Sequence, residues 1–110
     1  MITHEFILCE EVPEKIYFSN FSKNEMVIIN DEFVLNNPVP FQNVKMHSEY
    51  LGNVMLGLSY HGISILDVEM ANNLRKELLI HCKDCADLQK LINILEQGMT
   101  QNKYIIHFGV

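Results

Sequence analysis

The spacing of hydrophobic residues changes from a period of two to a helical period once along the chain, near residue 84. Before that point apolar residues stand in short runs or alternate with polar ones, and turn residues separate the runs. Beyond it they recur at three- and four-residue spacing, at Leu88, Leu91, Ile92, Leu95 and Met99. Short alternating runs predict strands, and the later spacing predicts an amphipathic helix that begins at an N-cap on Asp84.

The alternating part predicts strands at residues 4–10, 15–20, 25–30, 32–36, 44–48, 53–60, 63–69 and 76–83. The connections between them are short and contain turn residues such as Asn36-Asn37-Pro38 and His61-Gly62. Turns of this kind join neighbouring antiparallel strands, so we expect an antiparallel sheet. Gly52 and Gly57 interrupt an apolar segment and indicate a bulge or bend.

Two segments have further interpretations. Residues 67–82 would form a helix by the spacing of Met70, Leu74 and Leu78, but Asn72-Asn73 favours a turn, and we prefer a hairpin there. Residues 103–110, KYIIHFGV, are strand-like and nearly uncharged. We expect them to lie at an edge of the sheet or to be exchanged with a neighbouring molecule, which would make them an oligomer contact.

Three stretches give the chain a resemblance to the pleckstrin-homology-like superfold, as in small bacterial and FERM-type members. They are VMLGLSYHGISIL at 54–66, PVPFQNV at 38–44 and LLIHCKDCADLQKLINIL at 78–95. The resemblance implies one domain over 1–110, mainly β within the α+β class. Its fold would be an antiparallel, partly open barrel of about seven strands, closed by one C-terminal helix. It also implies recognition of proteins along a groove or sheet edge.

Composition supports one soluble domain. The chain has 110 residues, of which 48% are hydrophobic, and its apolar runs are far shorter than the about 20 residues that span a bilayer. The N-terminus has no basic leader, and three cysteines are an odd number for a disulfide framework. We therefore expect a cytoplasmic protein without membrane insertion.

The charge is concentrated in the first third of the chain. The net charge is −6, and residues 1–32 carry seven acidic residues against two lysines. A negative potential disfavours nucleic acid and anionic lipid and attracts basic partners. Where phosphoinositide-binding members of the superfold carry Lys and Arg, this chain has Glu10, Glu11 and Glu14, so lipid-headgroup binding is not expected.

Candidate chemistry is confined to one motif, Cys82-Lys83-Asp84-Cys85. A CxxC at the start of a helix lowers the pKa of its first thiol, which would suit redox chemistry. His81, Cys82 and Cys85, with His4 or Cys9, would be the ligands of a zinc site, but a second ligand pair is missing. No nucleophile elbow or phosphate loop is present. We expect no catalysis, no metal and no cofactor.

These observations lead to three hypotheses. The first is a non-enzymatic protein-binding or adaptor module, which associates with itself through residues 103–110 and binds a partner along a groove lined by Lys76, Gln89, Asn93 and Glu96. The second is a small acidic inhibitor, such as an immunity or anti-defence protein, that blocks a basic or nucleic-acid-binding partner through Glu10, Glu11, Glu14, Asp31 and Glu32. The third is a thiol or zinc enzyme at the CxxC.

Overall fold

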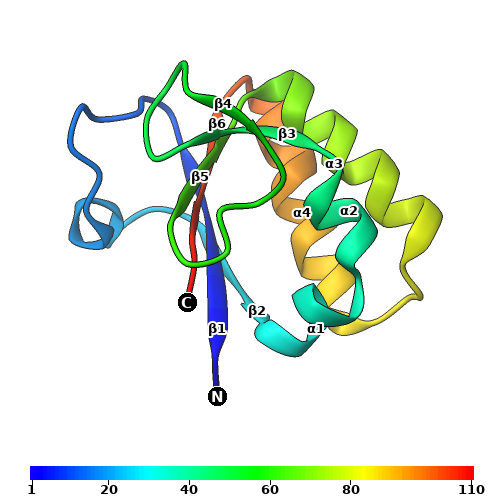
Figure 1. Ribbon diagram of the computed structural model, residues 1–110. Coiled ribbons are helices and arrows are strands. Elements are labelled where there is room, and N and C mark those ends of the chain that lie inside the picture. The colour runs from blue at the N-terminus through cyan, green and yellow to red at the C-terminus, as the bar shows by residue number, and fades with distance from the viewer.

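The computed structural model describes residues 1–110 as an open six-stranded antiparallel sheet with helices on one face (Figure 1). The strands are β1 (Thr3–Cys9), β2 (Met26–Asn30), β3 (Lys45–Ser48), β4 (Val54–Leu56), β5 (Ile63–Leu66) and β6 (Tyr104–Phe108). The helices are α1 (Asp31–Asn36), α2 (Pro38–Gln42), α3 (Val68–His81) and α4 (Ala86–Gln101), with a 3-10 turn, η1 (Phe18–Phe21). The strand order is β2-β1-β6-β5-β3-β4, so β2 and β4 are the edges.

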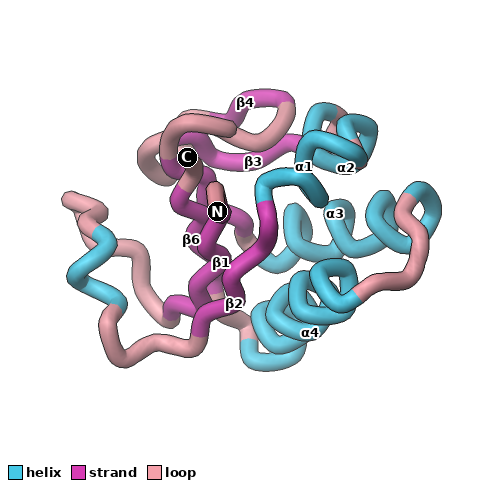
Figure 2. The backbone as a smooth tube through the Cα atoms, turned by 90° about the horizontal axis from the view of Figure 1, so that it is seen from below, coloured by secondary structure: helices cyan, strands magenta, loops and turns pink.

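The central strands of the sheet are covered on both faces. Figure 2 shows the four α-helices on one side and the β1–β2 connection, with η1, on the other. The main core lies on the helix side, where Phe6, Met46 and Ile105 are buried with Leu74 and Leu91. A smaller cluster on the opposite face packs Phe21 against Ile7, Ile65 and Ile106. Burial on both faces explains why β1 and β6 are apolar over several consecutive residues.

The antiparallel α+β arrangement expected from the sequence is confirmed, but the chain is not mainly β, because it has four α-helices where one was predicted. Three predicted strands are also wrong. Residues 15–20 form a loop and η1, and residues 32–36 lie in α1. Helix α1 begins directly after β2 because the side chain of Asn30 caps it, accepting a hydrogen bond from the N–H of Glu32. Residues 38–42, expected to lead into a strand, form α2, with proline in its first turn.

The third wrong strand, with the hairpin around it, is replaced by α3. The carboxylate of Asp67 caps this helix by accepting from the N–H of Met70 at 2.9 Å. Ala71, Leu74 and Leu78 face the core, whereas Leu79 and Ile80 are 51% and 72% exposed. The alternation at 78–83 therefore did not reflect a buried strand face, and Asn72-Asn73 lies inside the helix.

The expected barrel is also absent: the sheet stays open with two free edges, and has six strands where about seven were predicted. The predicted C-terminal helix is present as α4, but it packs on the face of β1, β2 and β6 and leads into another strand. Gly98 permits this packing, because a Cβ there would lie 3.1 Å from Cδ1 of Ile105. None of the helices combines the length and apolar character needed to cross a membrane.

Two predicted pairings are corrected by the strand order. Residues 54–66 do not form a hairpin of paired strands, because β3 lies between β4 and β5 and pairs with both. Residues 103–110 contain β6, which lies inside the sheet between β1 and β5. Both edges of β6 are hydrogen-bonded within the chain, so this segment is not the edge strand that the sequence predicted.

Candidate functional site

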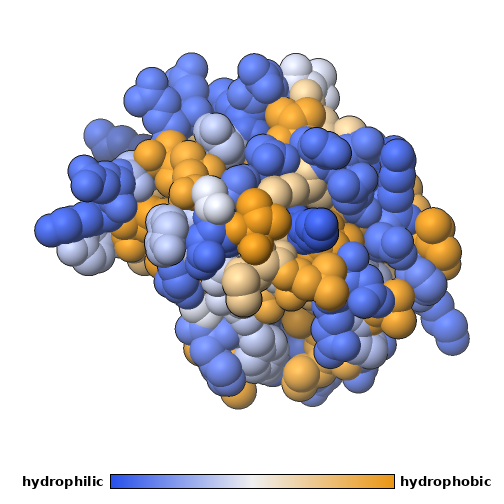
Figure 3. All heavy atoms as spheres, turned by 45° about the horizontal axis from the view of Figure 1, so that its top comes forward, coloured by the Kyte–Doolittle hydropathy of each residue, from blue (hydrophilic) through white to orange (hydrophobic).

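The edge strand β4 exposes more apolar surface than its neighbours. Val54, Met55 and Leu56 are 47%, 54% and 66% exposed, and Tyr50 and Leu51 in the preceding turn are exposed as well. In Figure 3 hydrophobic residues gather in the middle of the face that carries β3, β4 and α2, with hydrophilic residues around them. A contiguous apolar surface at a sheet edge is typical of an interaction site.

The backbone of β4 leaves hydrogen-bonding groups free at this edge. On the β3 side, the N–H of Ser48 donates to the C=O of Asn53, and the N–H of Gly57 donates to the C=O of Val44, both at 2.8 Å. Since N–H and C=O groups alternate between the two sides of a strand, residues 53, 55 and 57 face β3. Val54 and Leu56 therefore direct their N–H and C=O groups away from the sheet.

The edge also has none of the usual charged protection. Residues 50–60 contain no Asp, Glu, Lys or Arg, in a chain of net charge −6. Natural edge strands are commonly blocked by charged side chains or proline. The opposite edge, β2, exposes Met26 and Ile28, but Glu25 and Glu32 lie exposed near its two ends. Of the two edges, β4 is the better suited to accept another strand.

An apolar cavity lies beyond the end of β4. It has a volume of about 320 Å³ and is lined mainly by α1, α2 and the β4–β5 connection, through Val34, Leu35, Pro38, Phe41, Gln42, Leu58 and Tyr60. The N–H of Leu58 donates to the C=O of Phe41 at 2.7 Å and holds the connection against α2. The apolar edge thus continues from Leu56 through Leu58 to a hollow of side-chain size.

A buried polar network stands behind one wall of this cavity. The hydroxyl of Tyr60 donates to Oδ1 of Asp31 at 2.5 Å, and Nε2 of His4 lies 2.9 Å from the same oxygen. Nδ1 of His4 lies 2.8 Å from Nε2 of His107. Both histidines are completely buried, on the helix-side face of β1 and β6. The network ties β1, β6, α1 and the β4–β5 connection together.

Hydrogen bonding and burial set the protonation of this network. The hydrogen bond from Tyr60, and then that from His4, lowers the pKa of Asp31, which is therefore a carboxylate at neutral pH. The same bond raises the pKa of Tyr60, so its phenol stays protonated. Burial, and secondarily the charge of His4, lowers the pKa of His107 to about 3. The group nearest the cavity is therefore the phenol of Tyr60, which is protonated and held by a hydrogen bond. It is better suited to form a fixed wall of the cavity than to act as a general base.

Sequence reasoning missed this network and assigned Asp31 to an acidic surface. Asp31 is in fact 7% exposed, whereas Glu10, Glu11, Glu14 and Glu32 are exposed. The two acidic groups also lie at opposite ends of β1, a strand of seven residues and thus about 20 Å long. The one available signal was that His4 and His107 occupy core-facing positions of apolar strands.

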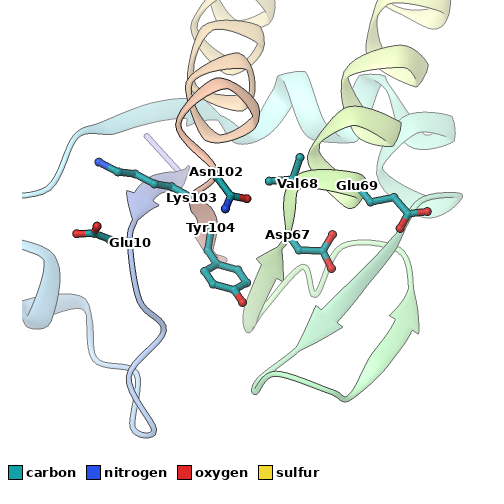
Figure 4. Close-up of a pocket in the computed structure, with 7 residues that line it drawn as sticks. All are labelled: Glu10, Asp67, Val68, Glu69, Asn102, Lys103 and Tyr104. Atoms are coloured by element: carbon teal, nitrogen blue, oxygen red, sulfur yellow. The ribbon is translucent and has the colours of Figure 1, made fainter.

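Glu10 borders a different hollow, of about 430 Å³. Figure 4 shows Glu10 and Lys103 on one side of Tyr104, and Asp67 and Glu69 on the other. Residues of both charge signs line this hollow, so it does not form a purely acidic surface for a basic partner. The five predicted acidic residues are therefore not brought together as one site.

The predicted groove residues lie on the two long helices. Lys76, expected on a strand, belongs to α3, and Gln89, Asn93 and Glu96 belong to α4. Glu96 accepts from Arg75 of α3 at 3.0 Å, and Gln89 donates to Asp84 at 2.6 Å. A groove between these four residues would run between two helices, whereas the strand predicted at 76–83 would have placed it between a strand and a helix.

The CxxC motif joins two helices instead of a strand and a helix. Cys82 ends α3, and the sulfur of Cys85 caps α4 by accepting from the N–H of Leu88. Burial, followed by the proximity of Cys85, raises the pKa of Cys82, and burial likewise raises that of Cys9. The expectation that the pKa of the Cys82 thiol is lowered, as in a redox site, is therefore wrong. No three His, Cys, Asp or Glu side chains are grouped so that they could hold a metal ion.

Comparisons of the chain with protein-family models, with curated proteins and with solved structures found no match.

Proposed function

We propose that the protein is a non-enzymatic, cytoplasmic protein-binding module that accepts an extended segment of a partner at the β4 edge. The observation that carries this proposal is the free backbone of Val54 and Leu56 within an exposed, uncharged apolar segment. Unpaired strand groups need hydrogen-bond partners, and apolar side chains beside them favour a partner strand over water.

Backbone and side chains would contribute differently to binding. Hydrogen bonds to Val54 and Leu56 would supply affinity for any extended segment, while side-chain pockets select the sequence. The cavity beside Tyr60 lies further along the same path and has room for one large apolar side chain. We therefore expect partners with an extended stretch that carries an aromatic or branched aliphatic residue.

The resemblance to pleckstrin-homology-like modules agrees with this function, since those modules bind proteins at a groove or sheet edge. It is not the basis of the proposal, because the open sheet has no closed barrel. Two features of the sheet support the proposal: the β4 edge is unpaired and uncharged, whereas the β2 edge has charged residues near its ends.

The test is selection from a displayed library of random peptides, with the site mapped by amide chemical shifts. We expect selected peptides to shift the amides of Val54 and Leu56. Val54→Pro removes one outward N–H and leaves the bonds to β3 intact, so it should weaken binding about tenfold, the loss of about 1 to 1.5 kcal/mol for one hydrogen bond. Val54→Thr is the matched control, because it retains the N–H and a β-branched side chain.

Three results would contradict the proposal. The first is that no peptide binds the chain in its monomeric form. The second is that Val54→Pro leaves the peptide affinity unchanged. The third is a partner that binds through Glu10, Glu11 and Glu14 with an association rate that falls steeply with salt. That behaviour would favour the acidic inhibitor instead, since electrostatic steering is screened by ions.

A further inference from the structure

We infer that the segment accepted by β4 is β4 of a second copy, so that the protein forms a twofold dimer with the axis at Met55. This inference rests on the proposed function and adds the identity of one partner. In a twofold interface the same surface meets itself and must be complementary to itself. The β4 edge meets that condition in its hydrogen bonds, its side chains and its charge.

The hydrogen bonds select a single register. With the axis at Met55, Val54 pairs with Leu56 of the partner subunit, and Leu56 pairs with Val54 of the partner subunit. Each pair exchanges two N–H to C=O bonds, so all the outward groups of Val54 and Leu56 are satisfied. Met55 then faces Met55 of the partner subunit in a pair without hydrogen bonds.

Neighbouring registers leave groups unpaired. Placing the axis at Val54 would oppose Leu56 to Gly52 of the partner subunit, where a φ of 97° has already ended the strand. Placing the axis at Leu56 would oppose Val54 to Leu58 of the partner subunit, whose N–H is already bonded to Phe41. A register shifted by one residue would need hydrogen bonds from the backbone of Met55, whose N–H and C=O groups face β3.

Side chains and charge agree with this register. Met55 is the ladder partner of buried Met46, so the two Met55 side chains would meet on the helix side of the joined sheet. Val54 and Leu56 would pair on the opposite side, covering surface that one copy leaves exposed. Residues 50–60 place no charge at the axis, although each copy carries a net charge of −6.

Oxidative cross-linking tests the register directly, with copper phenanthroline and oxygen as oxidant. The background carries Cys85→Ser, which removes the exposed thiol and keeps a good N-cap. Met55→Cys places the two thiols on Cα atoms about 4.5 Å apart, within disulfide reach. Val54→Cys separates them by about 8 to 9 Å, beyond that reach. We expect Met55→Cys to cross-link at least tenfold faster than Val54→Cys, and equal rates would overturn the inference.

Sedimentation equilibrium of the full chain supplies the second measurement. The wild type and Val54→Thr should dimerise, and Val54→Pro should dimerise at least tenfold more weakly. A wild type that stays monomeric, or a dimer weakened by Ile80→Lys on α3 and not by Val54→Pro, would overturn the inference. If peptides still bind the edge of a monomeric wild type, the proposed function stands and only self-pairing fails.

Discussion

At the scale of single residues, the environment of an acidic side chain decided its role more than its type did. Asp31 and Glu32 are neighbours in the sequence, yet Asp31 is buried and accepts bonds from His4 and Tyr60, while Glu32 is exposed. A carboxylate that satisfies two partners is part of the fold, and its loss leaves both partners without an acceptor.

Asp31→Ala should destabilise the protein measurably, whereas Glu32→Ala should have little effect. The first change leaves the completely buried His4 with an unsatisfied N–H, and a buried donor without a partner costs about 1 to 3 kcal/mol. Urea unfolding followed by circular dichroism measures both variants. Equal midpoints for the two would show that the network does not stabilise the fold.

At the scale of elements, burial overrode local propensity in residues 67–82. Two adjacent asparagines are poor helix formers, and they favoured a turn when read alone. In α3 they lie on the less buried side, while Ala71, Leu74 and Leu78 contribute to the core. The free energy of burying these three side chains exceeds the small helix penalty of the asparagines.

Replacing an exposed asparagine tests that account. Asn73→Ala should raise the free energy of unfolding by about 0.5 kcal/mol, because alanine is the better helix former at an exposed helical position. Asn73→Gly should lower it by a few tenths of a kcal/mol. If residues 67–82 formed a hairpin with its turn at Asn72-Asn73, alanine would instead destabilise the protein. Thermal and urea unfolding distinguish the two cases.

At the scale of the whole molecule, the buried His107 couples stability to pH. His107 would be protonated in the unfolded chain below about pH 6.5, but in the fold its pKa is lowered to about 3. The unfolded state therefore binds more protons than the folded state between these values. The contribution of neutral His107 to the free energy of unfolding is therefore complete above pH 6.5 and is lost as the pH falls toward 3.

Urea midpoints measured from pH 7 to pH 4.5 should record this loss. Below pH 6.5 the free energy of unfolding should fall with a contribution of up to about 1.4 kcal/mol per pH unit from His107. His107→Gln does not titrate and should show a shallower slope, whatever its stability at pH 7. Asp31, whose pKa is also lowered, acts in the same direction but only below its ordinary value of 3.8. The same slope in both proteins would contradict the assignment.

The sequence by itself determined the features that depend on local periodicity. The helix after Asp84, the strands of β1, β2 and β3 and the antiparallel pairing follow from how each segment divides its residues between core and solvent. Gly52 and Gly57, expected at a bend, both adopt positive φ and bound β4. The apolar character of residues 54–56 was visible in the sequence, but neither their exposure nor their position at an edge was.

Only the tertiary structure decided which segments became neighbours. The position of β6 between β1 and β5, and of β3 between β5 and β4, depends on contacts between residues far apart in the chain. Periodicity shows that a strand has a buried face but does not show what covers it. The same reason hid the network of His4, Asp31, Tyr60 and His107, whose members are far apart in sequence and are brought together when the sheet and α1 pack.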